Sequence, residues 1–479
     1  MQDNVSYPKF LFPGEDTMIL RDMVERFERQ APVCVMVRAA LENVLAADRL
    51  DALFEKTAIR QENKTLLFST VADLMGLVAC KIHPTVHAAY QAKQKQVGVT
   101  AKALYDKLQR MEPDISRAVV RETAARMHQI IAKMPGGCAP LVRGYRVKIL
   151  DGNHLRRTDR RIGELRELNI APLPGFCLVV LDPQTKLVCD IFPCEDAHTQ
   201  ERKLLPQILE TVQPQDLWMG DRNFCTTDFL ADIDRRLAFF VIRQHAQSLR
   251  WELIGKRKSA GRTETGRVYE QAVRLLAADG SGLVTIRRIT VELDEPTRDG
   301  EREVHILTNL PQRITALRVA ELYRRRWTIE TAFQEVAQSL HGEIQTLGYP
   351  KAALFAFSMA MVAYNVLSVI QAALRSAHGE QEINEKVSFY YLCDEVAGTY
   401  RGLLIAVPDD YWTRNYADLT PAQLAKELVR IARQIDLSRY RKHKRGPKKT
   451  KPPLNKKHRR HASTARILAQ TRPNSTVVC

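Results

Sequence analysis

The chain has 479 residues, of which 45% are hydrophobic and 27% charged. This composition is typical of a globular protein and excludes a mainly disordered, collagen-like or membrane-embedded class. At roughly 150 residues per domain, the length predicts about three domains. The net charge is +17, and residues 437–479 hold 14 Lys and Arg without an acid, which leaves only +3 for the rest. This cationic segment favours a polyanionic partner, either nucleic acid or an anionic membrane surface.

Cysteine and histidine spacing indicates neither a zinc site nor a disulfide framework. The nine cysteines form no Cys-x-x-Cys pair, and His154, His198 and His245 have no ligand spacing with them. The sequence has no Gly-x-x-x-x-Gly-Lys-Ser/Thr loop, so an ATP-driven mechanism has no support. Because Met1–Asp16 shows no secretory signal, a reducing cytoplasm is the expected location.

The N-terminal region, residues 16–135, is predicted to be helical because its apolar residues recur at helical spacing. Thr100 is an expected N-cap after a break at Gly98. Residues 86–112 fit either a helix-turn-helix or ordinary bundle packing. The following Pro-Gly-Gly sequence at 135–137 marks a boundary.

Strands alternate with helices in the next hundred residues. Helical stretches are expected near 199–212 and 227–235, which gives the order β-β-β-α-β-α-β. The predicted strands are Arg146–Asp151, Phe176–Leu181, Lys186–Phe192, Asp216–Met219 and Ala238–Arg243.

Residues 246–310 predict a small antiparallel β insertion. Asp279-Gly280 and Asp299-Gly300 are turn dipeptides between β-rich runs. Within residues 283–293 the apolar alternation changes phase at Arg287-Arg288, and a β-bulge is the expected cause.

The C-terminal part is predicted to be helical to about Asp436. The uncharged segment 352–374 passes the length test for a membrane helix. Its alanines and its polar residues, Asn365 and Gln371 among them, favour a helix buried in a protein core. Beyond Asp436 the Lys/Arg/Pro-rich composition cannot bury a core, and we expect a disordered tail.

Three acids stand where catalytic side chains are usually held. Asp151 ends a predicted strand and Asp221 follows another, and strand ends at one sheet edge hold side chains rigidly while leaving them accessible. The third acid, Glu330, belongs to a predicted helix over 319–341. At about 100° per residue, Tyr323, Arg326 and Glu330 lie within about 60° of one another, between an apolar stripe and a polar face. A turn role for each aspartate and an incidental Arg–Glu ion pair would also explain these residues.

Taken together, the motifs resemble a known family. The sequence YRRRWTIETAF, which contains Tyr323, Arg326 and Glu330, is similar to the Tyr-Arg-Glu-Lys motif of bacterial insertion-sequence transposases of the DDE class, family four type. The DGN at Asp151 and the GDRNF at Asp221 match the other two acids in context and order. The resemblance extends over about residues 140–375, and more loosely over the N-terminal region.

The resemblance implies an α/β fold, with a ribonuclease-H-like mixed sheet core, a β-rich insertion, and helical N-terminal and C-terminal regions. It also implies metal-dependent DNA cleavage and strand transfer (cut-and-paste transposition). Asp151, Asp221 and Glu330 would be the catalytic residues and would bind two Mg²⁺ or Mn²⁺ ions. The other residues expected to contact DNA are Tyr323, Arg326, Arg222, Arg243, Lys448, Lys449, Lys456, Lys457, Arg459 and Arg460.

The implied partners are the terminal inverted repeats of a transposon and a target duplex, bound by a homodimer that pairs two DNA ends. We expect a bacterial cytoplasmic, nucleoid-associated protein without a membrane partner. The alternatives are a non-catalytic DNA-binding protein derived from a transposase and a stand-alone metal-dependent nuclease. The predicted regions are 1–137 (helical, possible DNA-end binding), 138–245 (first part of the core), 246–310 (β insertion), 311–376 (second part, with the Glu330 helix), 377–436 (helical) and 437–479 (basic tail).

One position departs from the family motif. The family has a lysine seven residues after the glutamate, and this chain has Ala337, which cannot contact a phosphate. On the same helical face, Gln334 or His341 could partly replace that contact if the helix continues. Trp327 either packs beside the helix or stacks a displaced base.

Overall fold

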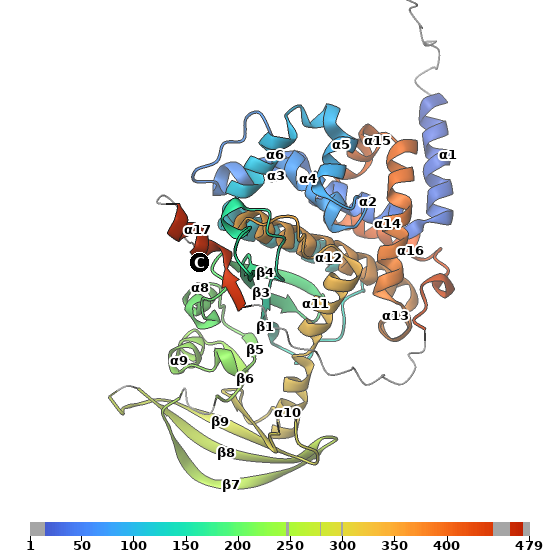
Figure 1. The fold of residues 1–479 in the computed structure, drawn as a ribbon. Coiled ribbons are helices and arrows are strands. Elements are labelled where there is room, and N and C mark those ends of the chain that lie inside the picture. Colours follow the sequence, from blue (N-terminus) through green and yellow to red (C-terminus); the bar gives the residue numbers. More distant parts are fainter. Residues whose placement is uncertain (1–14, 246–248, 278, 298–299, 444–459, 473–479) are drawn as a thin grey trace, which may run out of the picture.

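The computed structural model describes residues 15–245, 249–277, 279–297, 300–443 and 460–472, and within them the main sheet has nine strands (Figure 1). The sheet is mixed, in the order β4-β3-β1-β5-β6-β10-β9-β8-β7. Its first five strands are β1 (Arg146–His154), β3 (Phe176–Asp182), β4 (Leu187–Cys194), β5 (Asp216–Gly220) and β6 (Phe239–Arg243). With α8 (Leu205–Leu209) and α9 (Thr227–Arg235), these elements follow the predicted chain order, and the mixed α/β class is confirmed.

The β insertion is antiparallel, as predicted, and it extends the main sheet. β10 pairs with β6 on one side and with β9 on the other, so the insertion and the core share one hydrogen-bonded ladder. The insertion strands are β7 (Trp251–Thr263), β8 (Gly266–Leu276), β9 (Gly282–Leu293) and β10 (Glu303–Thr308).

The expected bulge at Arg287-Arg288 is wrong. β9 pairs with β8 and β10 in continuous register through both residues. The apolar pattern changes phase because both faces of β9 are covered: Ile286 belongs to one core cluster, and Ile289 to the other. A buried Arg287 lies between them and ion-pairs with Glu270 at 2.7 Å.

The N-terminal helical prediction is confirmed, down to the expected cap. Gly98 ends α5 with a φ of 67°, and the Thr100 hydroxyl accepts a hydrogen bond from the Ala103 N–H at the start of α6. Such capping satisfies N–H groups that the helix itself cannot pair. The helices of this region are α1 (Glu15–Gln30), α2 (Pro32–Val44), α3 (Ala47–Thr57), α4 (Phe68–Ala79), α5 (Val86–Val97), α6 (Ala101–Arg110) and α7 (Pro113–Ile131).

A long apolar helix, α12 (Pro350–His378), joins the sheet to these helices. It contacts β4 of the sheet together with α7, which packs on β4 as well, and it also contacts α4 and α6 (Figure 1). It is long and apolar enough to cross a membrane, but its most apolar window is entirely buried, as expected of a core helix. It is followed by α13 (Glu380–Lys386), α14 (Phe389–Ala406), α15 (Asp409–Trp412) and α16 (Pro421–Ala432).

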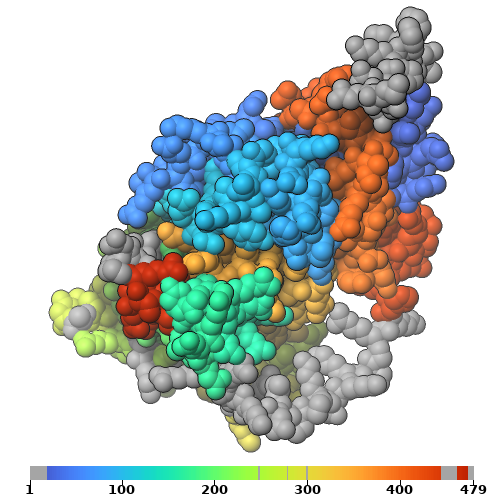
Figure 2. Space-filling view, turned by 45° about the horizontal axis from the view of Figure 1, so that its top comes forward, coloured from blue at the N-terminus to red at the C-terminus, as the bar shows by residue number. Residues whose placement is uncertain are grey.

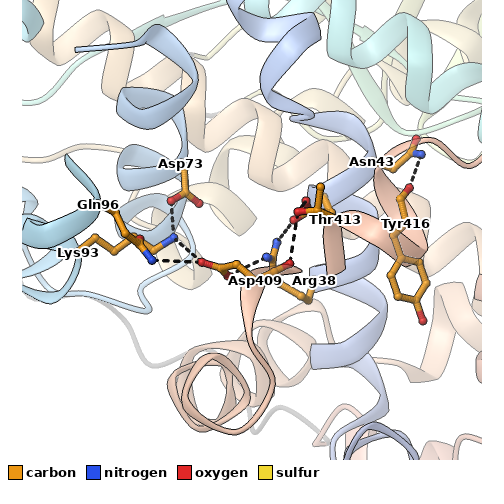
Figure 3. Close-up of polar contacts among 9 residues, drawn as sticks. Arg38, Asn43, Asp73, Lys93, Gln96, Asp409, Thr413 and Tyr416 are labelled. Carbon is orange, nitrogen blue, oxygen red and sulfur yellow. Dashed lines mark hydrogen bonds and ion pairs between the residues drawn. The ribbon is translucent and has the colours of Figure 1, made fainter. Parts of the chain in front are cut away.

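The two ends of the chain form one helical layer. α14 and α16 pack on α2, and Figure 2 shows the orange C-terminal helices beside the blue N-terminal ones. Polar contacts join the two segments (Figure 3). Arg38 of α2 bonds to Glu42 at 2.5 Å and to Asp409 at 3.1 Å, and Asp409 also lies 3.9 Å from Lys93. The side chains of Arg38 and Glu42 are only 9% and 14% exposed, so these charges depend on each other.

The expectation of a disordered tail is wrong for residues 460–472. β11 (Arg460–Ser463) pairs in parallel with β2 (Ile170–Leu173), a strand that the sequence did not predict. α17 (Thr464–Thr471) packs Leu468 against Ile162 and Leu165, where Figure 2 shows it in red beside the green core. Averaging composition over the whole cationic segment hid this short amphipathic end. Residues 444–459 lie outside the described part of the chain.

We predict that Arg38→Met lowers the free energy of unfolding by about 3–5 kcal/mol, because it leaves the buried Glu42 carboxylate without its cation, bonded to the neutral Thr413 hydroxyl. Urea denaturation followed by far-UV circular dichroism measures the loss. Arg21→Met is the matched control: it breaks the Arg21–Glu25 pair, whose side chains are 77% and 45% exposed, and should cost less than about 1 kcal/mol. Equal losses in the two variants would contradict the role given to the buried network.

Candidate active site

Strand register sets the two aspartates side by side. β1 and β5 are parallel neighbours, with Ile149 opposite Met219. Two residues further along both strands, the same register brings Asp151 next to Asp221. The Asp221 carboxylate accepts the Asn223 N–H at 2.8 Å, which fixes the turn after β5. The two acids therefore meet as predicted, but Asp151 does not end its strand: β1 continues to His154, and Asp151 pairs with Val179 of β3.

The third acid comes from a helix that is broken, contrary to the single helix predicted over 319–341. α10 (Ala316–Arg325) and α11 (Thr328–Ser339) are separated at Arg326-Trp327. The Thr328 hydroxyl donates to the Arg325 carbonyl at 2.7 Å, and the Ile329 N–H bonds to Arg326 O, which tightens the turn.

Arg326 keeps nearly helical backbone angles at this break, so the predicted grouping of Tyr323, Arg326 and Glu330 survives. Its guanidinium carbon lies 6.0 Å from the Tyr323 ring centre. The predicted position of Glu330 on the boundary between core and solvent agrees with its side chain, which is 47% exposed.

Arg326 joins the helix to the sheet. It is 9% exposed, and its Nη1 donates to Asp151 at 3.1 Å while its Nη2 donates to Glu330 at 3.0 Å. The Arg–Glu pair four residues apart is thus real, but a common amphipathic helix would not explain the second bond. That bond reaches Asp151, 175 residues earlier in the chain. Arg326, Asp151 and Glu330 therefore form one charged cluster.

A fourth carboxylate, Glu201, belongs to this cluster and was missed by sequence reasoning. It begins η2 (Glu201–Leu204), and its Oε2 lies 3.3 Å from the Asn223 amide. A Cβ on Gly152 would meet Glu201 Oε1 at 2.0 Å, so the absent side chain of Gly152 provides the room for this carboxylate. The glycine after Asp151 was the available signal, but the sequence does not show what approaches it.

Burial and repulsion from neighbouring carboxylates raise the pKa values of two acids in the cluster, Asp151 and Glu201. The pKa of Asp151 is raised to about 6: burial is the largest cause, Arg326 opposes it, and Asp221 and Glu330 add to the rise. Burial, then Asp221 and Asp151, also raise the pKa of Glu201. The cluster holds more negative charge than Arg326 balances, so an added cation would be stabilised there.

The oxygen ligands suit a divalent ion. Among the described residues, no three or more His, Cys, Asp or Glu side chains are already arranged around an ion position, and Arg326 bonds to two of these acids. Carboxylates are the ligands that Mg²⁺ and Mn²⁺ prefer, and turning Arg326 aside would free both. The donor set therefore fits such an ion.

The other residues predicted to contact DNA do not belong to the carboxylate cluster or lie outside the described residues. Arg222 and Arg243 both ion-pair with Glu301, at the junction of the core and the insertion. Trp327 is 58% exposed, so it does not pack in the core. Lys448, Lys449, Lys456, Lys457 and Arg459 lie outside the described residues, and only the backbone of Arg460 is described.

The family described as Transposase DDE domain matches residues 145–366, which include the three predicted acids. This match supports a DDE transposase. Among solved structures, the cryo-EM structure of the piggyBac transposase synaptic complex with hairpin DNA (SNHP) is similar at a TM-score of 0.39 and 10% identity, over 81% of this chain and 84% of that chain. Comparison with curated proteins gives no match.

We predict that Mg²⁺ raises the midpoint of thermal unfolding, because an ion that binds only the folded cluster stabilises it. Asp221→Asn and Glu330→Gln should each reduce that rise by removing a charged ligand. Differential scanning fluorimetry over a range of Mg²⁺ concentrations measures it. Asp228→Asn, an exposed change on α9, is the control and should keep the full rise. If Mg²⁺ raised the unfolding midpoint equally in all variants, the ion would not bind at this cluster.

Proposed function

We propose that this protein is the transposase of an insertion sequence, which cleaves DNA and transfers a strand in cut-and-paste transposition. The observation that carries the proposal is the meeting of Asp151, Asp221 and Glu330 near the C-terminal ends of the central strands β1 and β5, inside the matched transposase DDE domain. The order β4-β3-β1-β5-β6, with β1 antiparallel to β3 and parallel to β5, supports a ribonuclease-H-like core. The match to the family four motif, with Ala337 in place of lysine, belongs to the same proposal.

The side chains of the cluster would divide the work. Asp151, Asp221 and Glu330 would hold two Mg²⁺ or Mn²⁺ ions, which supply activation of the attacking oxygen and stabilisation of the leaving one. Arg326 would keep Glu330 oriented toward β1 and offer its guanidinium to a DNA phosphate. Tyr323, half-buried beside Arg326, would contact the DNA backbone.

The proposed partners follow from the chemistry. The substrates are two terminal inverted repeats and a target duplex, held by a homodimer because joining requires two ends. Residues 437–479, with 14 Lys and Arg and no acid, support DNA as the polyanion. We propose that the protein acts in the bacterial cytoplasm, at the nucleoid, without a membrane partner.

We predict that Asp151→Asn, Asp221→Asn and Glu330→Gln each abolish Mg²⁺-dependent cleavage while DNA binding remains. Each change removes a charge from the cluster and keeps the side-chain volume. Gel assays on a labelled terminal-repeat duplex measure cleavage, and fluorescence anisotropy measures binding. Asp228→Asn should cleave normally. If one of the three variants cleaves as fast as the unchanged protein, the residue it replaces is not catalytic.

We predict that Glu201→Gln slows cleavage. Gly152→Ala should slow it as well although every acid is kept, because the new Cβ occupies the place of Glu201 Oε1 and displaces that carboxylate. Both variants should fold, since Glu201 is a flexible side chain that can move away. Single-turnover cleavage rates decide the point. If Gly152→Ala cleaves normally, the position of Glu201 does not matter to the reaction.

The alternative functions give different products in one assay. With Mg²⁺, a labelled terminal repeat and a target duplex, a transposase yields a joined product. A stand-alone nuclease yields cuts without joining, and a non-catalytic DNA-binding protein leaves both duplexes intact. The loss of the motif lysine at Ala337 is the observation that favours the non-catalytic alternative.

The basic segment is proposed to bind DNA without regard to sequence. Residues 444–459 contain eight Lys and Arg and no acid. Because residues 460–471 pack on the core, truncation would remove folded structure as well as charge. Changing the eight cations to Gln removes the charge and leaves the packed elements β11 and α17 unchanged.

We predict that this eight-residue variant weakens binding to any duplex and flattens the log–log salt dependence by several units, at about 0.9 for each phosphate that the segment no longer neutralises. Anisotropy titrations at several salt concentrations, with terminal-repeat and random duplexes, measure both. The preference for the terminal repeat should change little, because base contacts carry sequence recognition. An unchanged slope would mean that the segment does not bind DNA.

A further inference from the structure

A cavity of about 460 Å³ lies beside the carboxylate cluster: its lining begins two residues after Asp151 on one segment and three residues after Glu330 on another, and it includes none of the four cluster acids. One wall is the end of β1 and the loop after it, beginning two residues beyond Asp151, and another is the face of α11 that carries Glu330. The third wall is the turn between α4 and α5, from the N-terminal helical region. The side chains that the argument uses are Lys81, His154, Arg156, Gln334, Ala337 and His341.

Ala337 lies on this cavity, on the same helical face as Glu330 and Gln334. Seven residues along a helix correspond to about 10 Å, which equals about three axial steps of ~3.4 Å per phosphate of one strand of duplex DNA. A strand whose reacting phosphate lies at the carboxylates would therefore bring another phosphate near Ala337. The α11 wall supplies no charge at this position.

Lys81 supplies a cation from the opposite wall. It is exposed, and its Nζ donates to Gln338 O at 2.8 Å, which uses one of the three ammonium donors. Its backbone has a φ of 58°, in the left-handed region that residues with a side chain rarely adopt. A hydrogen bond from His341 N to Ala79 O, at 2.8 Å, ties this turn to the end of α11. The strained turn thus holds Lys81 against the cavity.

The other lining groups leave Lys81 as the available charge. Arg156 is committed to Glu343: its N–H donates to that carboxylate at 2.5 Å, and its Nε lies 3.9 Å away. The predicted substitute His341 lies beyond α11, which ends at Ser339. Burial, with Lys81, lowers the pKa of His341, so this ring is neutral near pH 7. His154 is likewise kept neutral, because burial lowers its pKa.

We propose that this cavity binds a backbone phosphate of the DNA strand held at the carboxylates, and that Lys81 provides the positive charge which Ala337 does not. The proposal rests on the proposed function for the identity of the ligand. It gives the N-terminal helical region a direct part in holding the reacting strand.

The test is DNA binding by the full chain in EDTA, which excludes cleavage. Lys81→Gln should weaken anisotropy-measured binding of a labelled terminal-repeat duplex several-fold at moderate salt and lower the log–log salt slope by about 0.9, the value for one phosphate contact. Lys81→Arg should keep the slope. Ala337→Lys in the Lys81→Gln background should restore it, because the cation returns to the same cavity from another wall. Lys426→Gln, an exposed change on α16, is the control and should leave the slope unchanged.

Two results would overturn the proposal: a Lys81→Gln slope equal to that of the unchanged protein, or a double variant that stays as weak as Lys81→Gln. Thermal unfolding of each variant separates the effect of charge from an effect on folding. Cleavage assayed separately with Mg²⁺ keeps the two claims apart. A responsive slope without cleavage would reject only the proposed catalysis, and cleavage with an unresponsive slope would reject only the cavity.

Discussion

The bond from Arg326 to both Asp151 and Glu330 is the interaction around which the site is organised. It connects the break between α10 and α11 to the end of β1, so the helix carrying Glu330 cannot shift without exposing a buried guanidinium. The pKa of Asp151 is raised to about 6 by burial, with repulsion from Asp221 and Glu330 in the same direction and Arg326 opposing them. Such a cluster is stable as an arginine-bridged network and has the ligands to exchange that bridge for metal ions.

The rest of the fold holds this edge in place. The parallel register of β1 and β5 fixes the two aspartates, and α12 ties the sheet to a helical layer built from both ends of the chain. That layer brings Lys81 to the site, and the C-terminal strand β11 returns to the core beside β2. Segments distant in sequence therefore pack on the core that carries the carboxylates.

Local signals in the sequence predicted much of this structure. The strand and helix order, the cap at Thr100 and the grouping of Tyr323, Arg326 and Glu330 all depend on neighbours within a few residues. What was missed depends on contacts between distant segments. The pairing of β2 with β11 and the approach of Glu201 to Gly152 leave no periodic trace in the sequence. Burial of both faces of β9 produced the phase change that had suggested a bulge, and the expected single helix is broken at Arg326-Trp327.

The central claim is that Asp151, Asp221 and Glu330 exchange the Arg326 bridge for divalent ions. The most direct measurement is a crystal structure of the full chain with Mn²⁺, in which anomalous scattering locates the ions without assumptions about ligands. The account predicts Mn²⁺ peaks between these three carboxylates, with the Arg326 guanidinium moved off at least one of them. Mn²⁺ bound only elsewhere, with Arg326 still bonded to both Asp151 and Glu330, would contradict it.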